Sequence, residues 1–338
     1  MIRIFFLNQN FVCLFFELNA NFSRNSKIMT EEKLRIFNDL HDQYKHLGLP
    51  VELINRQSDF TIFNLADIKE SITFRSPISR LNFFVFAFVK NGQGNYTIDE
   101  QNFEIGPNTV YFTNPGHSRS FDWQQVDEVY LITLSESFLK ENVHGDIFEE
   151  FPFLLAETFP ARVLSPEIFE EFERLYLQIH KEYTSHSPFR NRLIGNLFVV
   201  LLLKIKEYFW LDYNPIYEGN RSSHIVKNFK RLLEKHYREL SNGEVDRAFR
   251  VQEYADDQSL HPNYLSNVIK AKTGKAIGTW IAEKTISEAK ALIQNSSISI
   301  KEIGFRLGFS ESAHFSNYFK KHTGASPAAF RKDHMMNV

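Results

Sequence analysis

The feature that most constrains how this chain folds is an internal repeat near its C-terminus. The segment Tyr264–Gly274 (YLSNVIKAKTG) returns fifty residues later as His314–Gly324 (HFSNYFKKHTG). Of the ten residue pairs that start at Leu265, five are identical, which is far above chance. Upstream, Val251–Ala255 matches Ile300–Gly304 with an offset that is one residue shorter. One folding unit therefore occurs twice in the chain.

Each copy has the pattern of two helices joined by a short turn. Apolar residues recur at helical spacing in the second helix of each copy, and Gly274 and Gly324 stand where these helices would end. The layout predicts two helix-turn-helix units, at about residues 248–274 and 298–324. The segment Thr279–Gln294 between them is expected to be a rigid helix that fixes their separation.

The second helix of each copy is expected to turn polar side chains outward, because its apolar residues are needed in a core. Asn can hydrogen-bond to an adenine edge, Ser can reach several bases, and Lys suits phosphate or guanine. If the two helices stand one duplex turn apart, about 34 Å, one chain can read two successive major grooves of double-stranded DNA. The predicted DNA-contacting residues are Asn263, Tyr264, Ser266, Asn267 and Lys270 in the first copy and Ser312, Ala313, His314, Ser316, Asn317, Lys320 and Lys321 in the second.

Charge is distributed unevenly along the chain. The net charge is −2, but residues 221–338 hold 19 Lys and Arg against 12 Asp and Glu, a net of +7, so the residues before them carry −9. A basic C-terminal part joined to an acidic N-terminal part suggests a polyanion-binding module with a partner that binds something else. The alternative is a helical repeat in a protein-binding bundle. Two polar Ser-Asn faces and the positive charge favour DNA.

The N-terminal half has a strand-like pattern from Asp59 to Leu134. Short apolar and aromatic runs alternate with turn signals, which is typical of a β-sandwich or a small barrel. We predict strands at Phe83–Val89, Tyr96–Ile98, Phe103–Ile105, Thr109–Thr113 and Val129–Leu134, with turns at Asn91–Gly94, Gly106–Pro107 and Pro115–Gly116.

The period of the pattern becomes helical after Ser135. Pro166–Tyr183 predicts an amphipathic helix with Pro166 in its first turn. Leu193–Trp210 is apolar nearly all round, with seven successive apolar residues from Leu197 to Leu203, so this helix is expected in a core or a dimer interface. The run is too short to cross a bilayer. Residues 212–222 then have the Asn, Pro, Gly and Ser content of a linker.

The first 28 residues carry two apolar pieces separated by Asn8–Asn10. They fit a signal peptide poorly, and neither piece approaches the length of about 20 residues that a membrane span needs. We expect residues 1–28 to be disordered or to precede a true translation start at Met29. A helix is predicted to open at Thr30 and to include Leu34–Leu40.

Signals for catalysis are absent from the sequence pattern. The single cysteine, Cys13, has no evident partner base, and neither a phosphate-binding glycine loop nor a Gly-x-Ser-x-Gly elbow occurs. We therefore expect no catalytic residue, no metal and no cofactor. One cysteine also allows no internal disulfide, which favours a reducing cytoplasm.

The C-terminal segment Ser223–Lys332 resembles the AraC/XylS family of transcription regulators. The segments Ile300–Ser310, Phe315–Lys321 and Thr323–Pro327, followed by Phe330-Arg331, are similar to the signature of that family almost end to end. The resemblance implies a seven-helix DNA-binding domain whose recognition helices fall on residues 263–272 and 312–321.

Two positions depart from the family pattern. Thr285 stands where the family usually has a basic residue, which puts one backbone contact or ion pair in doubt. Gly304 replaces the usual Ala, a change that loosens a helix by about 1 kcal/mol.

The N-terminal half resembles the cupin-type sensor domain that commonly precedes this module, with Asn114–His117 similar to its typical turn. Cupin metal sites need clustered His and Glu ligands, and His117 alone is more often a turn residue than a ligand. The aromatic residues of the predicted strands suit an effector pocket or a plain core, and alternation along a strand sends only every second one inward. The candidates for ligand contact are Phe84, Phe86, Phe88, Tyr96, Tyr111 and Trp123.

Together these patterns predict an α+β protein with a cupin-like β-barrel or sandwich at 29–140, a helical dimerisation segment at 141–211, a linker at 212–222 and an all-α domain at 223–333 with two helix-turn-helix units. The predicted function is sequence-specific transcription regulation, for instance as an activator, by a cytoplasmic homodimer that is either constitutive or modulated by a small effector. RNA polymerase is a further candidate partner, and a membrane is not. The alternatives are an architectural DNA binder without sequence preference and a cupin-like enzyme fused to DNA-binding helices.

Overall fold

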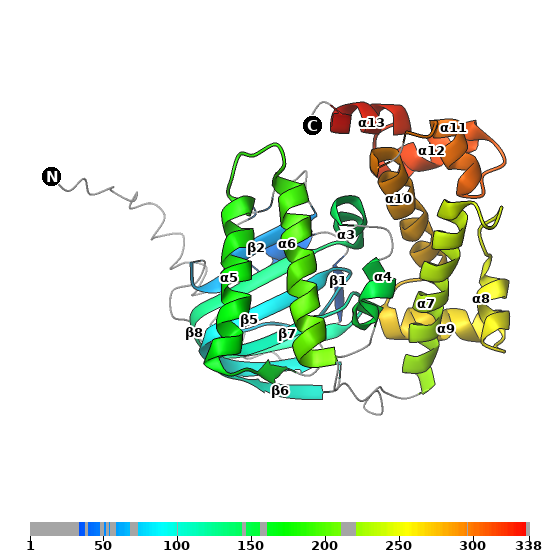
Figure 1. Ribbon diagram of the computed structural model, residues 1–338. Coiled ribbons are helices and arrows are strands. Elements are labelled where there is room, and N and C mark those ends of the chain that lie inside the picture. Colours follow the sequence, from blue (N-terminus) through cyan, green and yellow to red (C-terminus); the bar gives the residue numbers. More distant parts are fainter. Residues whose placement is uncertain are drawn as a thin grey trace. The chain divides into compact units, whose positions relative to one another are not determined.

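The computed structural model describes residues 34–37, 40–47, 51, 54, 59–67, 74–99, 101–143, 147–155, 161–210, 221–295 and 297–335. The expectations for residues 1–28 and for positions 212–220 of the linker lie outside the described residues. A sheet-rich part precedes a helical part along the chain, so the protein belongs to the α+β class as predicted (Figure 1).

Nine of the described segments form one sheet, in the order β1-β4-β8-β5-β7-β9, with β2 and β3 also paired to β8 and β6 to β5. The two longest strands, β5 and β8, run antiparallel side by side and connect the shorter ones. The strands are β1 (Arg35–Phe37), β2 (Phe60–Asn64), β3 (Phe74–Arg75), β4 (Ser79–Leu81), β5 (Phe84–Ile98), β6 (Gln101–Ile105), β7 (Thr109–Thr113), β8 (Ser118–Leu134) and β9 (Arg162–Val163).

Side-chain alternation along β5 supplies two separate cores. Its phenylalanines at 84, 86 and 88 enter the core that the sheet shares with the helices after β8, whereas Val85, Ala87 and Val89 enter the core on the opposite face. Alternate residues of a strand point to opposite faces, so one apolar run can be buried on both sides.

The predicted turn at Asn91–Gly94 is wrong, because β5 continues through these residues to Ile98. The pairing with β8 is irregular here, with register shifts on both sides of Asn91 and before Gly94. A Cβ atom at Gly94 would lie 2.7 Å from the carbonyl oxygen of Asp122. The glycines therefore allow β8 to approach closely at a β-bulge, and they do not reverse the chain.

The predicted helix opening at Thr30 and running through Leu34–Leu40 is also wrong within the described residues. Arg35–Phe37 forms β1, parallel to β4, and the helix α2 (Leu40–Leu47) begins only at Leu40. Phe37 is buried beside Leu81 in the core of the sheet, while the two residues before it are exposed. Pairing with β4 overrides the local helical signal.

The helices after β8 cover one face of the sheet. In Figure 1, α5 and α6 cross the strands β5, β7 and β8. The helix α5 begins at Pro166 as predicted, where the Ser165 hydroxyl accepts a hydrogen bond of 3.4 Å from the Ile168 amide. These elements are α3 (Glu136–Asn142), α4 (Ile147–Glu150), α5 (Pro166–Tyr183) and α6 (Arg190–Ile205), with 3₁₀ turns η3 (Leu65–Asp67) and η4 (Pro152–Leu155) and a π-helical end η5 (Lys206–Trp210).

Seven helices follow residue 220 in the described part of the chain, the number that the family resemblance implies. The first half of α10 packs into the core of the helices before it, through Ile277 and Trp280. Its second half packs into the core of the helices after it, through Ile286, Ala289 and Ile293. The helices are α7 (Arg221–Asn242), α8 (Val251–Asp257), α9 (Pro262–Thr273), α10 (Ile277–Asn295), α11 (Ile300–Arg306), α12 (Ser312–Thr323) and α13 (Pro327–Met335).

None of the helices in the described residues combines the length and the apolar character that a membrane span requires.

Candidate nucleic-acid interface

The two repeated segments form two helix pairs, α8 with α9 and α11 with α12, and their second helices have the same burial pattern. Leu265 and Ile269 are buried in α9, and Phe315 and Phe319 are buried at the matching positions of α12. The remaining positions of both helices alternate between exposed and half-buried in the same order from residue 261 to 270 and from residue 311 to 320. The repeat therefore presents two equivalent faces to solvent.

The turn inside each pair depends on one residue with left-handed backbone geometry. Ser259 has φ 53° between α8 and α9, and Gly308 has φ 82° between α11 and α12. A Cβ at Gly308 would lie 2.8 Å from the Ala248 nitrogen, in the loop that precedes α8. Glycine is needed in the second turn because this turn packs against the first unit.

The repeated Thr-Gly pair ends both second helices in the same way. The hydroxyl of Thr273 donates to the Ile269 carbonyl at 2.7 Å and accepts from the Lys275 amide at 3.2 Å. Thr323 does the same with Phe319 and Ala325, at 2.9 Å and 3.4 Å. The glycines that follow have φ of 72° and 82°, the left-handed geometry of a helix C-cap.

The structure brings the predicted DNA-contacting residues together on these two faces. Three serines, Ser266, Ser312 and Ser316, are half-buried. Among the described residues, no carboxylate forms an ion pair with the lysines of these faces, so their charges remain available for phosphate. The exposed residues are Asn263, Tyr264, Asn267 and Lys270 on α9 and Ala313, His314, Asn317, Lys320 and Lys321 on α12.

Hydrogen bonds tie α10 to the first recognition helix and to α7. The Trp280 indole donates to the Thr273 hydroxyl at 3.1 Å, at the end of the first recognition helix. Thr285, the position where the family usually has a basic residue, is buried, and its hydroxyl lies 2.6 Å from the Tyr237 hydroxyl. This position therefore serves packing between α10 and α7 in this chain.

Two equivalent helix-turn-helix units with exposed amide, hydroxyl and ammonium groups define a DNA-binding transcription regulator. Residues 254–333 match the family described as helix-turn-helix domain, and this C-terminal part of the chain is a DNA-binding domain of the AraC type.

Three curated relatives illustrate the similarity. The chain is 22% identical over 258 residues to the Msm operon regulatory protein of Streptococcus mutans, covering 74% of this chain and 84% of that one. It is 24% identical over 259 residues to the HTH-type transcriptional activator RhaR of Salmonella schwarzengrund, covering 75% and 86%. It is 34% identical over 92 residues to the arabinose operon regulatory protein of Escherichia coli, covering 27% of this chain and 32%, about a third, of that relative.

Two solved structures are also similar to the chain. The DNA-binding domain of AdpA in complex with a target DNA is 21% identical and covers 35% of this chain and 96% of that one, with a TM-score of 0.29. ToxT from Vibrio cholerae is 14% identical and covers 81% of this chain and 97% of that one, with a TM-score of 0.34.

The aromatic candidates for ligand contact are divided between the two faces of the sheet. Phe84, Phe86 and Phe88 pack against the covering helices, for example with the Phe86 ring 5.1 Å from that of Phe198 on α6. Tyr111 and Trp123 line a cavity on the other face. Tyr96 is buried there and stacks on Tyr111, with ring centroids 4.5 Å apart.

The sequence interpretation missed three polar residues of this cavity, Arg119, Gln43 and Tyr44. Arg119 lies in the first half of β8, upstream of the segment predicted as a strand, so its inward direction could not be inferred. Gln43 and Tyr44 lie on α2, whose start was misplaced. A signal was nevertheless present, since Arg119 lies two and four residues before Phe121 and Trp123, in the alternating pattern of a strand.

His117 stabilises the turn after β7. Its Nδ1 atom lies 2.8 Å from a carboxylate oxygen of Asp99, which also accepts hydrogen bonds from Ser118. Burial alone would raise the pKa of Asp99, but the bonds from His117 and Ser118 outweigh it and lower this pKa to about 2. Within the described residues, no group of three or more His, Cys, Asp and Glu side chains could hold a metal ion.

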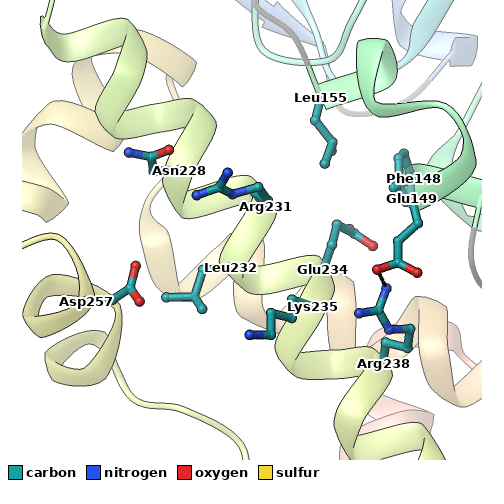
Figure 2. A pocket seen from close by; sticks show the side chains of 10 residues that line it. All are labelled: Phe148, Glu149, Leu155, Asn228, Arg231, Leu232, Glu234, Lys235, Arg238 and Asp257. Atoms are coloured by element: carbon teal, nitrogen blue, oxygen red, sulfur yellow. Dashed lines mark ion pairs between the residues drawn. The ribbon is translucent and has the colours of Figure 1, made fainter.

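A second cavity, of about 310 Å³, lies between α7, α8 and the segment that holds α4 and η4 (Figure 2). Several of its charged side chains form ion pairs. Arg238 forms an ion pair with Glu149, and Glu234 pairs with Lys140 and Lys284. Arg231 and Lys235, one helical turn apart on α7, are exposed to solvent.

Proposed function

We propose that this chain reads two successive major grooves with α9 and α12, and that a small effector bound in the sheet domain modulates this binding. The observation that carries the proposal is that Asn267 and Asn317 are both exposed, at equivalent positions of two recognition helices. Amide side chains at such positions suit base edges, and the nearby lysines suit the phosphate backbone.

The proposal is tested by mapping where the protein binds in its own genome. The mapped site and a scrambled version of it are then titrated with purified full-length protein at several salt concentrations. Sequence-specific binding predicts a preference of about 10³ or more for the mapped site. Equal affinity for both DNAs would contradict the proposal and favour the architectural alternative.

Replacing Lys320 by alanine is expected to weaken binding to the mapped site and to scrambled DNA by the same factor. Lys320 is exposed on α12 and its ammonium group suits a phosphate, which carries no sequence information. The slope of log affinity against log salt should become shallower by about one. Fluorescence anisotropy titrations measure both quantities. The control Lys181→Ala, at an exposed lysine of α5, should change neither one.

We further propose that the chain acts as a homodimer through α6. One stripe of this helix exposes Leu193, Val200 and Leu203, each with about 42–43% of its surface accessible. These positions are 7 and 3 residues apart, so they share one face. A second copy that places the same stripe against this one would bury all of them in an isologous contact.

Replacing Val200 by aspartate is therefore expected to convert a dimer into a folded monomer. Sedimentation velocity gives the oligomeric state, and circular dichroism verifies the fold. Val163→Asp is the control, because Val163 is exposed on β9 outside the stripe and should leave the dimer intact. Leu201→Asp should instead unfold the domain, because Leu201 is buried in the core. A Val200→Asp protein that remains dimeric would exclude this interface.

A cytoplasmic location, contact with RNA polymerase and the absence of catalysis complete the proposal. Relatives are named activators and operon regulatory proteins, which supports a role at promoters. An activator that recruits the polymerase should raise transcription from the mapped promoter in a purified system without any further protein.

A further inference from the structure

The sheet domain has a cavity of about 60 Å³ on the face opposite α5 and α6. A cavity of this size holds about four or five water molecules, so it suits a small organic molecule. Aliphatic and aromatic side chains together form most of its wall and a few polar groups line it, the composition of a ligand pocket. The lining includes the aromatic side chains of Tyr44, Tyr111, Phe121 and Trp123 and the polar side chains of Gln43 and Arg119.

Arg119 is the unusual member of this wall. Only 4% of its surface is accessible, yet its Nε and Nη1 atoms have no hydrogen-bond partner among the described residues. The guanidinium carbon lies 5.4 Å from the centre of the Phe121 ring. Asp99, at the end of β5, uses its carboxylate for His117 and Ser118. A buried cation thus has no counterion among the described residues, a strongly unfavourable arrangement unless a partner arrives.

The groups around Arg119 do not neutralise it. Burial raises the pKa of Tyr44, Tyr96 and Tyr111, so all three hydroxyls are uncharged at neutral pH. The Tyr111 hydroxyl and the Gln43 carbonyl oxygen also lack partners among the described residues. Several unsatisfied polar atoms therefore meet in one cavity, where an anion with hydrogen-bonding oxygens could satisfy them.

We propose that this cavity is the effector site and that its ligand is a small organic carboxylate held by Arg119. The inference rests on the proposed function, since it assigns a chemical class to the effector. The planar fork of a guanidinium matches a carboxylate through two parallel hydrogen bonds. The aromatic walls formed by Phe121 and Trp123 contact the apolar body of the acid, and an inorganic anion would leave them without contact.

The test titrates full-length protein with acetate, propionate and butyrate, each beside its amide, and with inorganic phosphate. Isothermal calorimetry gives the affinities. At least one carboxylate should bind about tenfold or more tightly than its amide, because only the acid makes a charge-assisted hydrogen bond. If every acid binds no better than its amide, the assignment is overturned. Tighter binding of phosphate than of all three acids overturns it as well.

Variants of Arg119 show whether this residue is responsible for the preference for a carboxylate over its amide. Arg119→Met should abolish the preference for acid over amide, and Arg119→Lys should keep part of it, since the charge stays and the fork is lost. Arg162→Met, at an exposed arginine of β9, should behave like the unmodified protein.

Thermal unfolding without ligand provides an independent measurement. Removal of a buried cation without a counterion should leave the melting temperature of Arg119→Met equal or higher. A marked fall would mean that Arg119 has a structural partner, which contradicts the proposal.

Failure of this inference can be distinguished from failure of the proposed function. The preference of the ligand-free protein for its mapped DNA site is measured separately and does not involve Arg119. Loss of that preference refutes the proposed function, whatever the acids do. Intact DNA preference without acid binding refutes only the effector assignment.

Discussion

Replacing Lys284 by methionine is expected to lower the free energy of unfolding by about 3–5 kcal/mol, because it leaves buried carboxylates without their cation. Only 1% of the Lys284 side chain is accessible. Its ammonium group pairs with Glu136 at 3.1 Å and with Glu288 at 3.4 Å, and it also contacts Glu234. Lys140 on α3 shares two of these acids.

The balance of charge in this cluster explains the size of the effect. Two lysines face three carboxylates, so removal of one lysine leaves an excess of buried negative charge. Burial would lower the pKa of Lys284, but the three acids outweigh it and raise the pKa above its usual value. Burial raises the pKa of Glu234, which makes it the acid most ready to take up a proton.

Urea unfolding of full-length protein measures the loss. The control Lys235→Met, at an exposed lysine of α7 whose contact to Glu239 is 3.8 Å long, should cost less than about 1 kcal/mol. Adding Glu234→Gln to Lys284→Met should recover part of the loss, since it removes the excess charge. If Lys284→Met and Lys235→Met lower the free energy of unfolding by the same amount, the buried cluster around Lys284 does not stabilise the protein as described.

The loss of unfolding free energy in Lys284→Met should also depend on pH. With the lysine absent, the folded protein holds a proton on the cluster at pH values where the unfolded chain has released it. The folded pKa is thus raised above the unfolded value, and stability falls as the pH rises toward the folded pKa. Unfolding at pH 5 should therefore show a smaller loss than unfolding at pH 8.

Replacing Asn267 and Asn317 together by alanine is expected to reduce discrimination between the mapped site and scrambled DNA by about 2–6 kcal/mol. A bidentate contact of an amide to adenine discriminates by about 1–3 kcal/mol, and the two positions lie on separate helices. Both side chains are exposed at the same place in α9 and α12. Competition binding with the two DNAs measures the change.

The control for this pair is Asn242→Ala, at an exposed asparagine that ends α7 outside the recognition helices. It should keep the full discrimination. Each single variant should lose about half of the combined effect. Equal weakening on both DNAs would mean that the asparagines contact only the backbone, as the architectural alternative requires.

The helical part of the fold could be predicted from the sequence because its information is local. The Thr-Gly pairs at 273–274 and 323–324 mark both helix ends, and the hydrogen bonds of these threonines explain why the pair is repeated. The proline at 166 likewise marks the start of α5. Each signal acts within one turn of its own helix.

The sheet domain was predicted less well because its signals depend on neighbours far away in the sequence. Gly94 is indistinguishable from a turn glycine until β8 is placed against it. The short segment before α2 becomes a strand only because β4 lies beside it. Arg119 could not be assigned to a cavity for the same reason, since its surroundings come from α2, β7 and β8.

Under the proposed reading of two grooves, α10 restricts which DNA this protein recognises, because this helix packs into the cores of both helix-turn-helix units. A single uninterrupted helix belongs to both halves of the reading domain, so no hinge separates them. One extra base pair between the two contacted sites would move the second by about 3.4 Å and turn it by about 35° around the duplex. Binding sites in the genome should therefore share one fixed spacing, while the bases in the interval are free to vary.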